Sequence, residues 1–280
     1  MASETGTLYI SGTKETAAER LKEVLKYRTL LWSLAWRDIR VRYKQSLLGV
    51  VWALAVPLAT MLLFSFVFSQ VVPLKTDIPY PIFAYCGILP WQLFASSTTG
   101  ATNSLIANRS LVTKIYFPAE VFPLSSIIAA LVDFAVGGII LVGMMIFFSV
   151  TGANITVSWT VLFFPVVLAV QLLFTMGIGF LLAMGNVFFS DVRYVYSIGI
   201  TLWMFASSVV YPMKTEDPTM QLILSLNPIT PILDAYRDVL LRGKLPDPFS
   251  FGFAAFISLV VFIVGWSIFR RMQYRFAEKA

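Results

Sequence analysis

Asp133 is the only acidic residue that lies deep within an apolar segment of this 280-residue chain. A charged group at the depth of a membrane core is costly and normally faces protein or water. A proton-coupled transporter would need such a carboxyl group, ideally with a basic partner, but no Lys, Arg or His occurs in another apolar segment. We therefore expect Asp133 to have a structural or pore-facing role rather than to relay protons.

The sequence lacks the residue sets that most enzymes use. It contains no histidine, which excludes His-based catalytic triads and His-rich metal sites. It contains no Gly-x-x-x-x-Gly-Lys-Ser/Thr phosphate loop, no pair of acids suited to glycoside chemistry and no nucleophile elbow. The single cysteine, Cys86, is expected to be a small buried side chain. We expect no catalytic, cofactor-binding or metal-binding residue, so any ATP and Mg²⁺ would be bound by a separate protein.

The composition places most of the chain in a membrane. Hydrophobic residues make up 58% of it and charged residues only 13%, which is about half the usual share for a soluble protein. Apolar segments that suggest membrane helices run at about 47–72, 82–105, 121–150, 158–189, 194–212 and 251–269. The sequence therefore predicts an all-α integral membrane protein with six transmembrane helices. It forms one membrane domain, residues 27–280, behind an N-terminal tail at 1–26.

The distribution of Lys and Arg orients these segments. If six spans alternate, sixteen of the 21 bases lie on one side, at the two termini and in the loops after the second and fourth spans. Cytoplasmic loops carry such an excess of bases, so both termini are predicted to be cytoplasmic. Membrane topology thus explains the net charge of +6, and we expect no nucleic-acid partner.

Residues 27–46 combine aromatic and basic side chains directly before the first apolar segment. At helical spacing the apolar and aromatic members share one face, consisting of Trp32, Ala35, Trp36, Ile39 and Tyr43. The bases on a neighbouring face are Arg37, Arg40 and Lys44. The pattern predicts a helix at the membrane surface. This helix either anchors the first span or also contacts a cytoplasmic partner.

Two further segments lie between the spans. The basic loop Ala107–Glu120 is either a simple connection or a short helix that lies across a partner. On the opposite side, Leu226–Lys244 predicts a helix with Thr230 as its N-cap and Gly243 at its end. Its apolar stripe consists of Ile232, Leu233, Tyr236, Val239 and Leu240, and the charged residues off that stripe are Asp234, Arg237, Asp238 and Arg242. This helix would line or lid an exit, or cap the bundle.

The second apolar segment is unusually polar between Ser96 and Ser104. Hydroxyl groups in such a helix often bond to the backbone or to a neighbouring helix. They could equally line a hydrated path, and the sequence leaves both interpretations open.

Five motifs, in this order and at this spacing, resemble the membrane subunit of a type-two ABC exporter, in the branch that exports polysaccharides across the bacterial inner membrane. The resemblance runs from about Trp32 to Phe276. The motifs are WRDIRVRYKQSLLGVVWALAVPLA (36–59), GILPWQLFASSTTGATNSL (87–105), NRSLVTKIYFPAEVFPLSS (108–126), NVFFSDVRYV (186–195) and LNPITPILDAYRDVLLRG (226–243).

The resemblance implies a permease that is not an enzyme by itself. It implies a homodimer on two copies of a cytoplasmic ABC ATPase, which binds ATP and Mg²⁺. The substrate would be a polysaccharide on an undecaprenyl-type lipid, such as O-antigen, and the pore would form between the two protomers within the inner membrane. Closure of the ATPases would move an interface helix (27–46) and a coupling helix (about 107–118) and so widen that pore.

The same resemblance assigns candidate sites. The candidates for the ATPase interface are Trp36, Arg37, Arg40, Lys44, Asn108, Arg109, Lys114, Tyr116, Asp191 and Arg193. The candidates in outer gate helices, at about 213–250, are Asn227, Pro228, Pro231, Asp234, Tyr236 and Arg237. The candidates for pore lining are Trp91, Phe94, Ser97, Thr98 and Asn103.

Other functions fit the sequence less well. An export permease for teichoic acid, capsule, a drug or a lipid would share the architecture, although drug and lipid exporters often have larger outer domains or lack the basic aromatic segment. An ion-coupled secondary transporter would need more buried ionisable residues than Asp133. A membrane-embedded glycosyl or lipid transferase would need acidic or His-containing clusters, and the sequence shows none.

Overall fold

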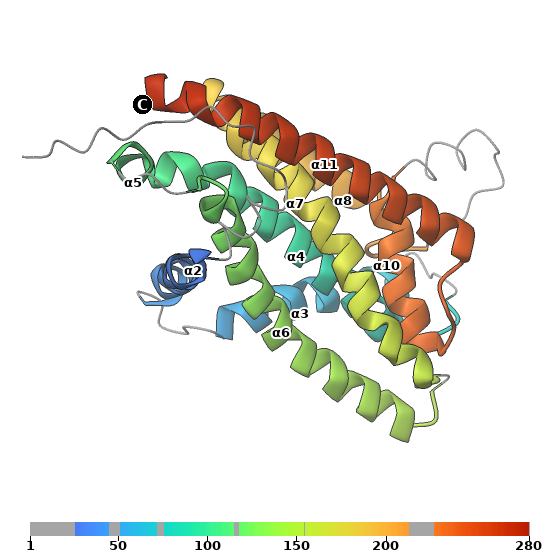
Figure 1. Cartoon of the computed structure of the whole chain (residues 1–280). Coiled ribbons are helices and arrows are strands. Elements are labelled where there is room, and N and C mark those ends of the chain that lie inside the picture. The colour runs from blue at the N-terminus through green and yellow to red at the C-terminus, as the bar shows by residue number, and fades with distance from the viewer. Residues whose placement is uncertain are drawn as a thin grey trace, which may run out of the picture.

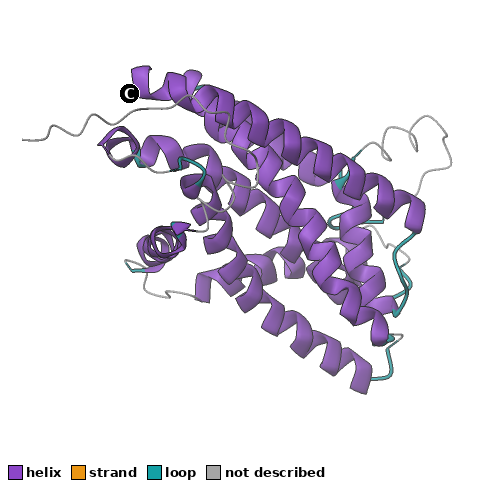
Figure 2. Cartoon of the chain, in the orientation of Figure 1, coloured by secondary structure: helices purple, strands orange, loops and turns teal. Residues whose placement is uncertain are grey.

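The computed structural model describes residues 26–44, 51–71, 76–114, 118–153, 155–212 and 227–279. Within these ranges the secondary structure is helical, with no strand (Figure 2). The elements are α2 (Arg28–Tyr43), α3 (Val51–Phe66), η1 (Val67–Val71), α4 (Tyr80–Ala107), α5 (Arg109–Lys114), α6 (Val121–Val150), η2 (Trp159–Phe163), α7 (Phe164–Phe188), α8 (Val192–Phe205), α10 (Ile229–Arg237), η3 (Asp238–Arg242) and α11 (Pro248–Lys279). Residues 1–25 of the predicted tail (1–26) and the first part of the predicted gate segment, 213–226, lie outside the described residues.

Four helical stretches of the described chain are long and apolar enough to cross a membrane. They are Val51–Ser69, Val121–Val150, Trp159–Phe188 and Pro248–Gln273. The other two predicted spans correspond to α4 and α8. Helix α4 has 28 residues but carries the polar run Ser96–Ser104. Helix α8 has 14 residues, about 21 Å at 1.5 Å per residue, and ends at Phe205 rather than near 212. The four apolar stretches are therefore direct candidates for spans, and α4 and α8 need a separate argument.

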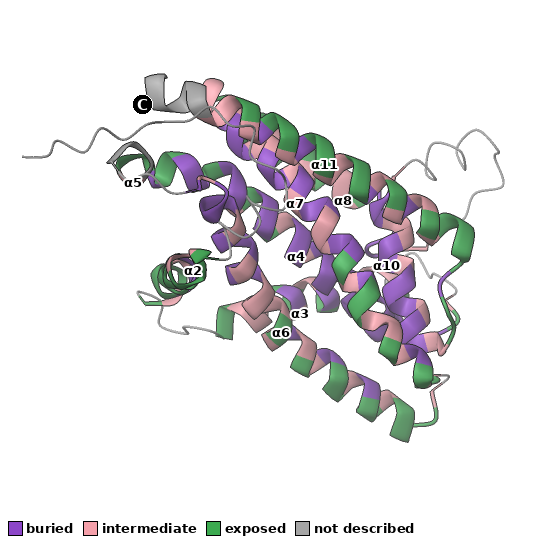
Figure 3. Cartoon of the chain, viewed as in Figure 1, coloured by how far each residue is buried: buried purple, intermediate pink, exposed green. Residues whose placement is uncertain are grey.

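Helix α4 is the centre of the bundle. It packs against α6 and α7 along most of its length, and α3, α8 and α10 also contact it. An unbroken run of ten residues, Ile82–Trp91, is buried, and this run includes Cys86, as predicted (Figure 3). Protein rather than lipid surrounds most of α4, which explains why it tolerates polar side chains that would be costly against lipid.

Helices α7 and α11 form the closest helix pair. A Cβ added at Gly177 would lie 2.6 Å from the carbonyl carbon and oxygen of Val261, and one at Gly265 would collide with the Gly177 carbonyl. Small residues of this kind let two backbones approach closely, which is how helices gain packing energy in a membrane. Asp247 directly precedes α11 and caps it, because its carboxylate accepts hydrogen bonds from the backbone N–H and the hydroxyl of Ser250.

The predicted sites separate to two ends of the bundle. Helices α2 and α5 and the C-terminal end of α11 lie at one end, and α10 lies toward the other (Figure 1). The sequence also placed residues 27–46 and 226–244 on opposite sides of the membrane. We call the two ends of the bundle the α2 end and the α10 end.

Candidate functional site

Helix α2 covers most of the predicted interface helix. Leu34, Ala35 and Ile39 are buried, and α2 packs mainly on α6. Trp32 and Trp36, which the sequence pattern placed on one face with Ala35, are 56% and 44% exposed. That predicted face is therefore buried only in part, and Leu34 from outside it joins the contact with the bundle. The exposed face of α2 carries aromatic and basic side chains outward.

Arg37 joins α2 to the corner between α4 and α5. Its Nη1 donates a hydrogen bond of 2.7 Å to Oδ1 of Asn108, which is 5% exposed. The amide nitrogen of Asn108 in turn donates to the Ser104 carbonyl at 2.8 Å. Two residues predicted for the ATPase interface are thus in direct contact, so α2 and the coupling segment can move together.

The remaining candidates for the ATPase interface are mostly exposed. Trp36, Arg40, Lys44, Arg109, Asp191 and Arg193 all reach the surface. Arg40 lies 5.7 Å from the Trp36 ring, and Arg193 stacks 4.6 Å from the ring of Tyr194. Lys114 ends α5, but its side chain and the whole of Tyr116 lie outside the described residues. The exposed candidates thus carry mostly positive charges, and two of the arginines lie against aromatic rings.

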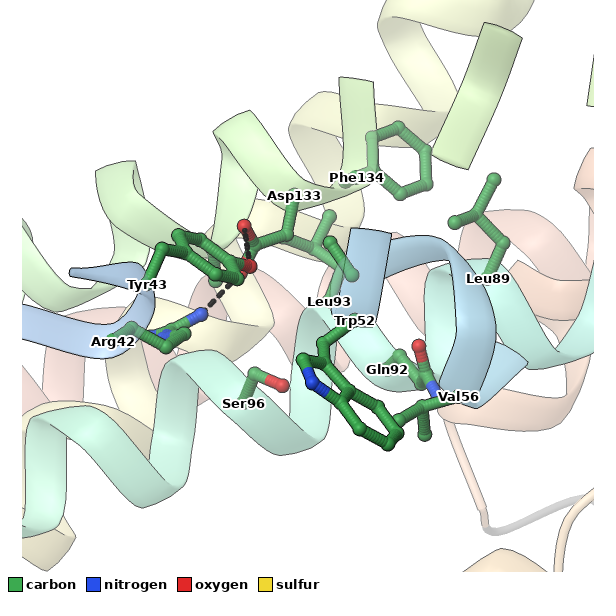
Figure 4. Close-up of a pocket in the computed structure, with 12 residues that line it drawn as sticks. Arg42, Tyr43, Trp52, Val56, Leu89, Gln92, Leu93, Ser96, Asp133 and Phe134 are labelled. Atoms are coloured by element: carbon green, nitrogen blue, oxygen red, sulfur yellow. Dashed lines mark hydrogen bonds and ion pairs between the residues drawn. The ribbon is translucent and has the colours of Figure 1, made fainter. Parts of the chain in front are cut away.

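Asp133 finds its partners in α2 rather than in another span (Figure 4). Arg42 makes an ion pair with its carboxylate, and the Tyr43 hydroxyl donates to Oδ1 at 2.7 Å. Burial, followed by the hydrogen bond to Asp133, raises the pKa of Tyr43 to about 12. The phenol therefore keeps its proton at neutral pH and donates a hydrogen bond to the carboxylate. This cluster satisfies Asp133, in agreement with the structural role expected for it.

A cavity of about 340 Å³ lies beside this cluster. It is lined by residues at the end of α2, at the start of α3 and in the middle of α4 and α6, and it is open on one side. Its polar lining includes Arg42, Gln92, Ser96 and Asp133, and the indole of Trp52 borders it (Figure 4). The C-terminal end of α2 therefore rests on polar contacts at the edge of an open space rather than on a packed apolar core.

The α10 end is built around Arg237, which is fully buried. Its guanidinium donates to the carbonyls of Val209 (2.7 Å) and Phe83 (3.3 Å) and pairs with Asp234 at 2.9 Å. It also lies 3.8 Å from the Phe83 ring centre. The sequence pattern placed Arg237 off the buried stripe, and this expectation is wrong. The side chain turns inward, where the Val209 carbonyl after α8 and the Phe83 carbonyl in α4 accept its hydrogen bonds.

The rest of the predicted gate forms a second polar layer. The Tyr236 hydroxyl donates to Gln171 on α7 at 2.6 Å, and the Gln171 amide donates to the Pro90 carbonyl on α4 at 2.7 Å. The Asn227 side chain accepts from the Trp203 indole and from the Ile229 backbone N–H. The helix therefore begins after Pro228 with Asn227 as its capping side chain, and not at Thr230 as predicted. Pro231 lies within α10 and is partly buried.

The end of this segment agrees better with the prediction. Gly243 has φ 63°, the left-handed conformation expected of a glycine at a helix end. Arg242 pairs with Asp238 at 2.9 Å, as the spacing of four residues suggested, and also pairs with Asp77. The two carboxylates, through their hydrogen bonds, raise the pKa of Arg242 further, so it stays charged.

Most of the candidate pore-lining residues are buried inside a single chain. Trp91, Phe94, Ser97 and Thr98 are at most 5% exposed, whereas Asn103 is exposed. Phe94 packs in an aromatic cluster with Phe174 and Trp203. Thr98 bonds to the Phe94 carbonyl and to the Tyr196 hydroxyl of α8. The first interpretation of the polar run thus holds for Thr98, which bonds to the backbone and to a neighbouring helix, and a hydrated path stays a prediction.

The exposed polar face of α4 follows a different register. Gln92, Ser96, Thr99 and Asn103 lie three or four residues apart, which places them on one side of the helix. Gln92 is partly exposed and the other three are exposed. Helix α3 borders this face at the cavity, and α8 contacts α4 on its other side through Thr98. We call these four residues the α4 polar stripe.

Comparison with known proteins agrees with this arrangement. Residues 29–241 match the family described as ABC-2 type transporter. The O-antigen export system permease protein RfbA of Myxococcus xanthus is 34% identical over 261 residues, covering 92% of this chain and 98% of that protein. A protein of the same name from Klebsiella pneumoniae is 32% identical, covering 89% and 94%. The polysialic acid transport protein KpsM of Escherichia coli is 24% identical, covering 86% and 92%. The chain therefore belongs to the ABC-2 type transporter family of membrane permeases.

Proposed function

We propose that this chain is the membrane permease of an ABC transporter that exports a lipid-linked polysaccharide of the O-antigen type across the bacterial inner membrane. The observation that carries this proposal is the similarity, along almost the whole chain, to permeases named for O-antigen export. The similarity to a polysialic acid transport protein is weaker, so export of a capsule-like polymer is the second candidate.

The permease works with other subunits. Two copies of this chain form the pore, and two copies of a separate ATPase bind ATP and Mg²⁺ beneath them. The exposed bases and rings of α2, including Trp36 and Arg40, support docking of an ATPase at the α2 end. Arg37 and Asn108 then carry motion from α2 into α4.

The topology of the proposal has six spans with both termini in the cytoplasm. Four spans are the apolar stretches, and α4 and α8 supply the other two. Helix α4 is about 42 Å long, more than a ~30 Å hydrocarbon core requires. The α4 polar stripe supports a hydrated route for the polymer, because hydroxyl and amide groups left against lipid would each cost several kcal/mol.

Deletion of the gene tests the function directly. Cells without the permease should accumulate lipid-linked polymer inside and lose it from the surface, and a plasmid copy should restore export. Normal surface polymer in a deletion strain that has no second exporter would contradict the proposal. Purification of the intact complex should also recover an ATPase subunit. Replacement of Arg37, Arg40 and Lys44 by Glu should release that subunit while the permease stays in the membrane.

Cysteine labelling tests the route. Cys86 is the only cysteine and is buried, so single cysteines can be added to the natural chain. We expect a charged, water-soluble thiol reagent to label Ser96→Cys, Thr99→Cys and Asn103→Cys, and trapped polymer to protect them. Ile139→Cys is the control, since Ile139 is 73% exposed on the apolar α6 and should face lipid. Equal labelling of stripe and control positions would argue against the route.

A further inference from the structure

The most unusual group outside the proposed ATPase surface and the route is the carboxylate of Asp133. It is the only acid in the four candidate membrane spans. Its side chain is 21% exposed, and its two partners, Arg42 and Tyr43, both come from the last turn of α2. A single residue of α6 thus holds the end of a helix that lies outside the spans.

The two halves of α2 are held in different ways. The first half buries Leu34 and Ala35, and Ile39 continues that face. At the last turn the apolar contact ends, and Arg42 and Tyr43 border the cavity instead. The Arg42 side chain is 38% exposed. The position of this turn relative to α6 therefore depends on the three-residue polar cluster and not on side-chain packing.

We propose that Asp133 is a positioning residue that couples displacement of α2 to α6, so that force applied to the interface helix by the ATPase reaches a membrane span. This inference rests on the proposed function. A charged pair suits the task because the attraction between two opposite charges in contact resists their separation. The adjacent cavity leaves the last turn of α2 room to shift while the pair stays closed.

The pair gives α2 a second attachment that differs from the first. Arg37 links the middle of α2 to the start of α5 through Asn108, whereas Asp133 links its end to the middle third of α6. With both attachments closed, α2 cannot turn about either one alone. A push on α2 would then reach α4 and α6 together.

The test compares the amount of polymer exported per ATP hydrolysed in the reconstituted permease–ATPase complex. In Asp133→Asn, we expect ATP hydrolysis to continue and polymer export per ATP to fall by about tenfold, because the Arg42 charge is left without its partner and no longer holds α2 to α6. Arg42→Gln should have the same effect. The double variant R42Q/D133N removes both charges and retains amide hydrogen bonding, so it should recover most of the export.

The controls separate coupling from folding. Arg271→Gln removes the same charge from an exposed position on α11 and should leave export per ATP unchanged. If Asp133 only stabilises the fold, complex yield, ATP hydrolysis and export should fall together and their ratio should stay constant, which would overturn the inference. A double variant no better than the single variants would also overturn it. Failure of the wild-type complex to export polymer would instead reject the proposed function.

Discussion

The two ends of this molecule each use an arginine to fix a short helix to the bundle, but they do so in different surroundings. At the α10 end, Arg237 is fully buried and bonds to the carbonyls of Phe83 and Val209. At the α2 end, Arg42 is 38% exposed and borders a cavity. The first arrangement makes a rigid junction between α10, α4 and the turn after α8. The second fixes α2 at a few points and leaves it room to move.

This difference corresponds to the tasks proposed for the two ends. A junction that seals the proposed outer side must hold its shape while the pore opens nearby, and a buried guanidinium with four hydrogen bonds serves that purpose. A helix that receives force from an ATPase must be attached firmly but not packed on all sides. The predictions below test whether the α10 end carries stability and the α2 end carries coupling.

The largest expected effect is that of Arg237→Ala. Its removal empties the space of a large buried side chain and takes a hydrogen-bond donor from the Phe83 and Val209 carbonyls, which should lower the free energy of unfolding by about 3–5 kcal/mol. Thermal unfolding of the purified complex measures the change. Arg271→Ala, at an exposed position on α11, is the control and should unfold like the wild type. Equal unfolding of both variants would show that the α10 end is not the stable junction.

Gly87→Ala should have the next largest effect. Helix α4 approaches Arg237 and Val209 so closely at this position that an added methyl group would collide with the Val209 carbonyl oxygen and the guanidinium. Overpacking of this kind costs about 1–3 kcal/mol. Gly138→Ala on α6 is a matched control because its added Cβ meets nothing within 4 Å. Similar melting temperatures for the two alanine variants would contradict the close approach.

Tyr236→Phe should have a smaller effect at the same end. The variant keeps the ring in its place but leaves the buried Gln171 oxygen without its donor, at a cost of about 1–2 kcal/mol in unfolding free energy. Tyr194→Phe, at an exposed ring on α8, is the control. If Tyr236→Phe is as stable as this control, the second polar layer adds nothing to the junction.

The sequence predicted the elements well and the contacts between them less well. Length, hydropathy and charge predicted the helices and placed α2 and α10 outside the main spans, because apolar runs and helix-end residues such as Gly243 act locally. The predicted end of the span at α8, near residue 212, lies seven residues beyond the observed end of the helix at Phe205. There the chain turns to offer the Val209 carbonyl to Arg237, a tertiary demand that no local pattern contains.

The candidate sites show the same limit. A basic partner for Asp133 was expected only in another span, whereas its partner is Arg42 in the helix before the spans. Arg42 belongs to neither of the two faces predicted for that helix, and this irregular position was the signal. Gln171 was missed altogether, although an amide in an otherwise apolar span is a signal of a buried partner. The α4 polar stripe could not be predicted from the sequence. Polar residues lie on several sides of that helix, and only the packing of the neighbouring helices shows which of them stay exposed.

The smallest expected effect on stability, at the α2 end, completes the comparison. Arg37→Ala removes a side chain that is 43% exposed, and Asn108 keeps its bond to the Ser104 carbonyl, so unfolding should change by less than about 1 kcal/mol. Export per ATP should nevertheless fall, since α2 loses its link to the corner of α4 and α5. Melting and export are measured on the same preparation. A loss of stability as large as that of Arg237→Ala would show that the α2 end is a rigid junction too, and unchanged export per ATP would show that force reaches the bundle by another contact.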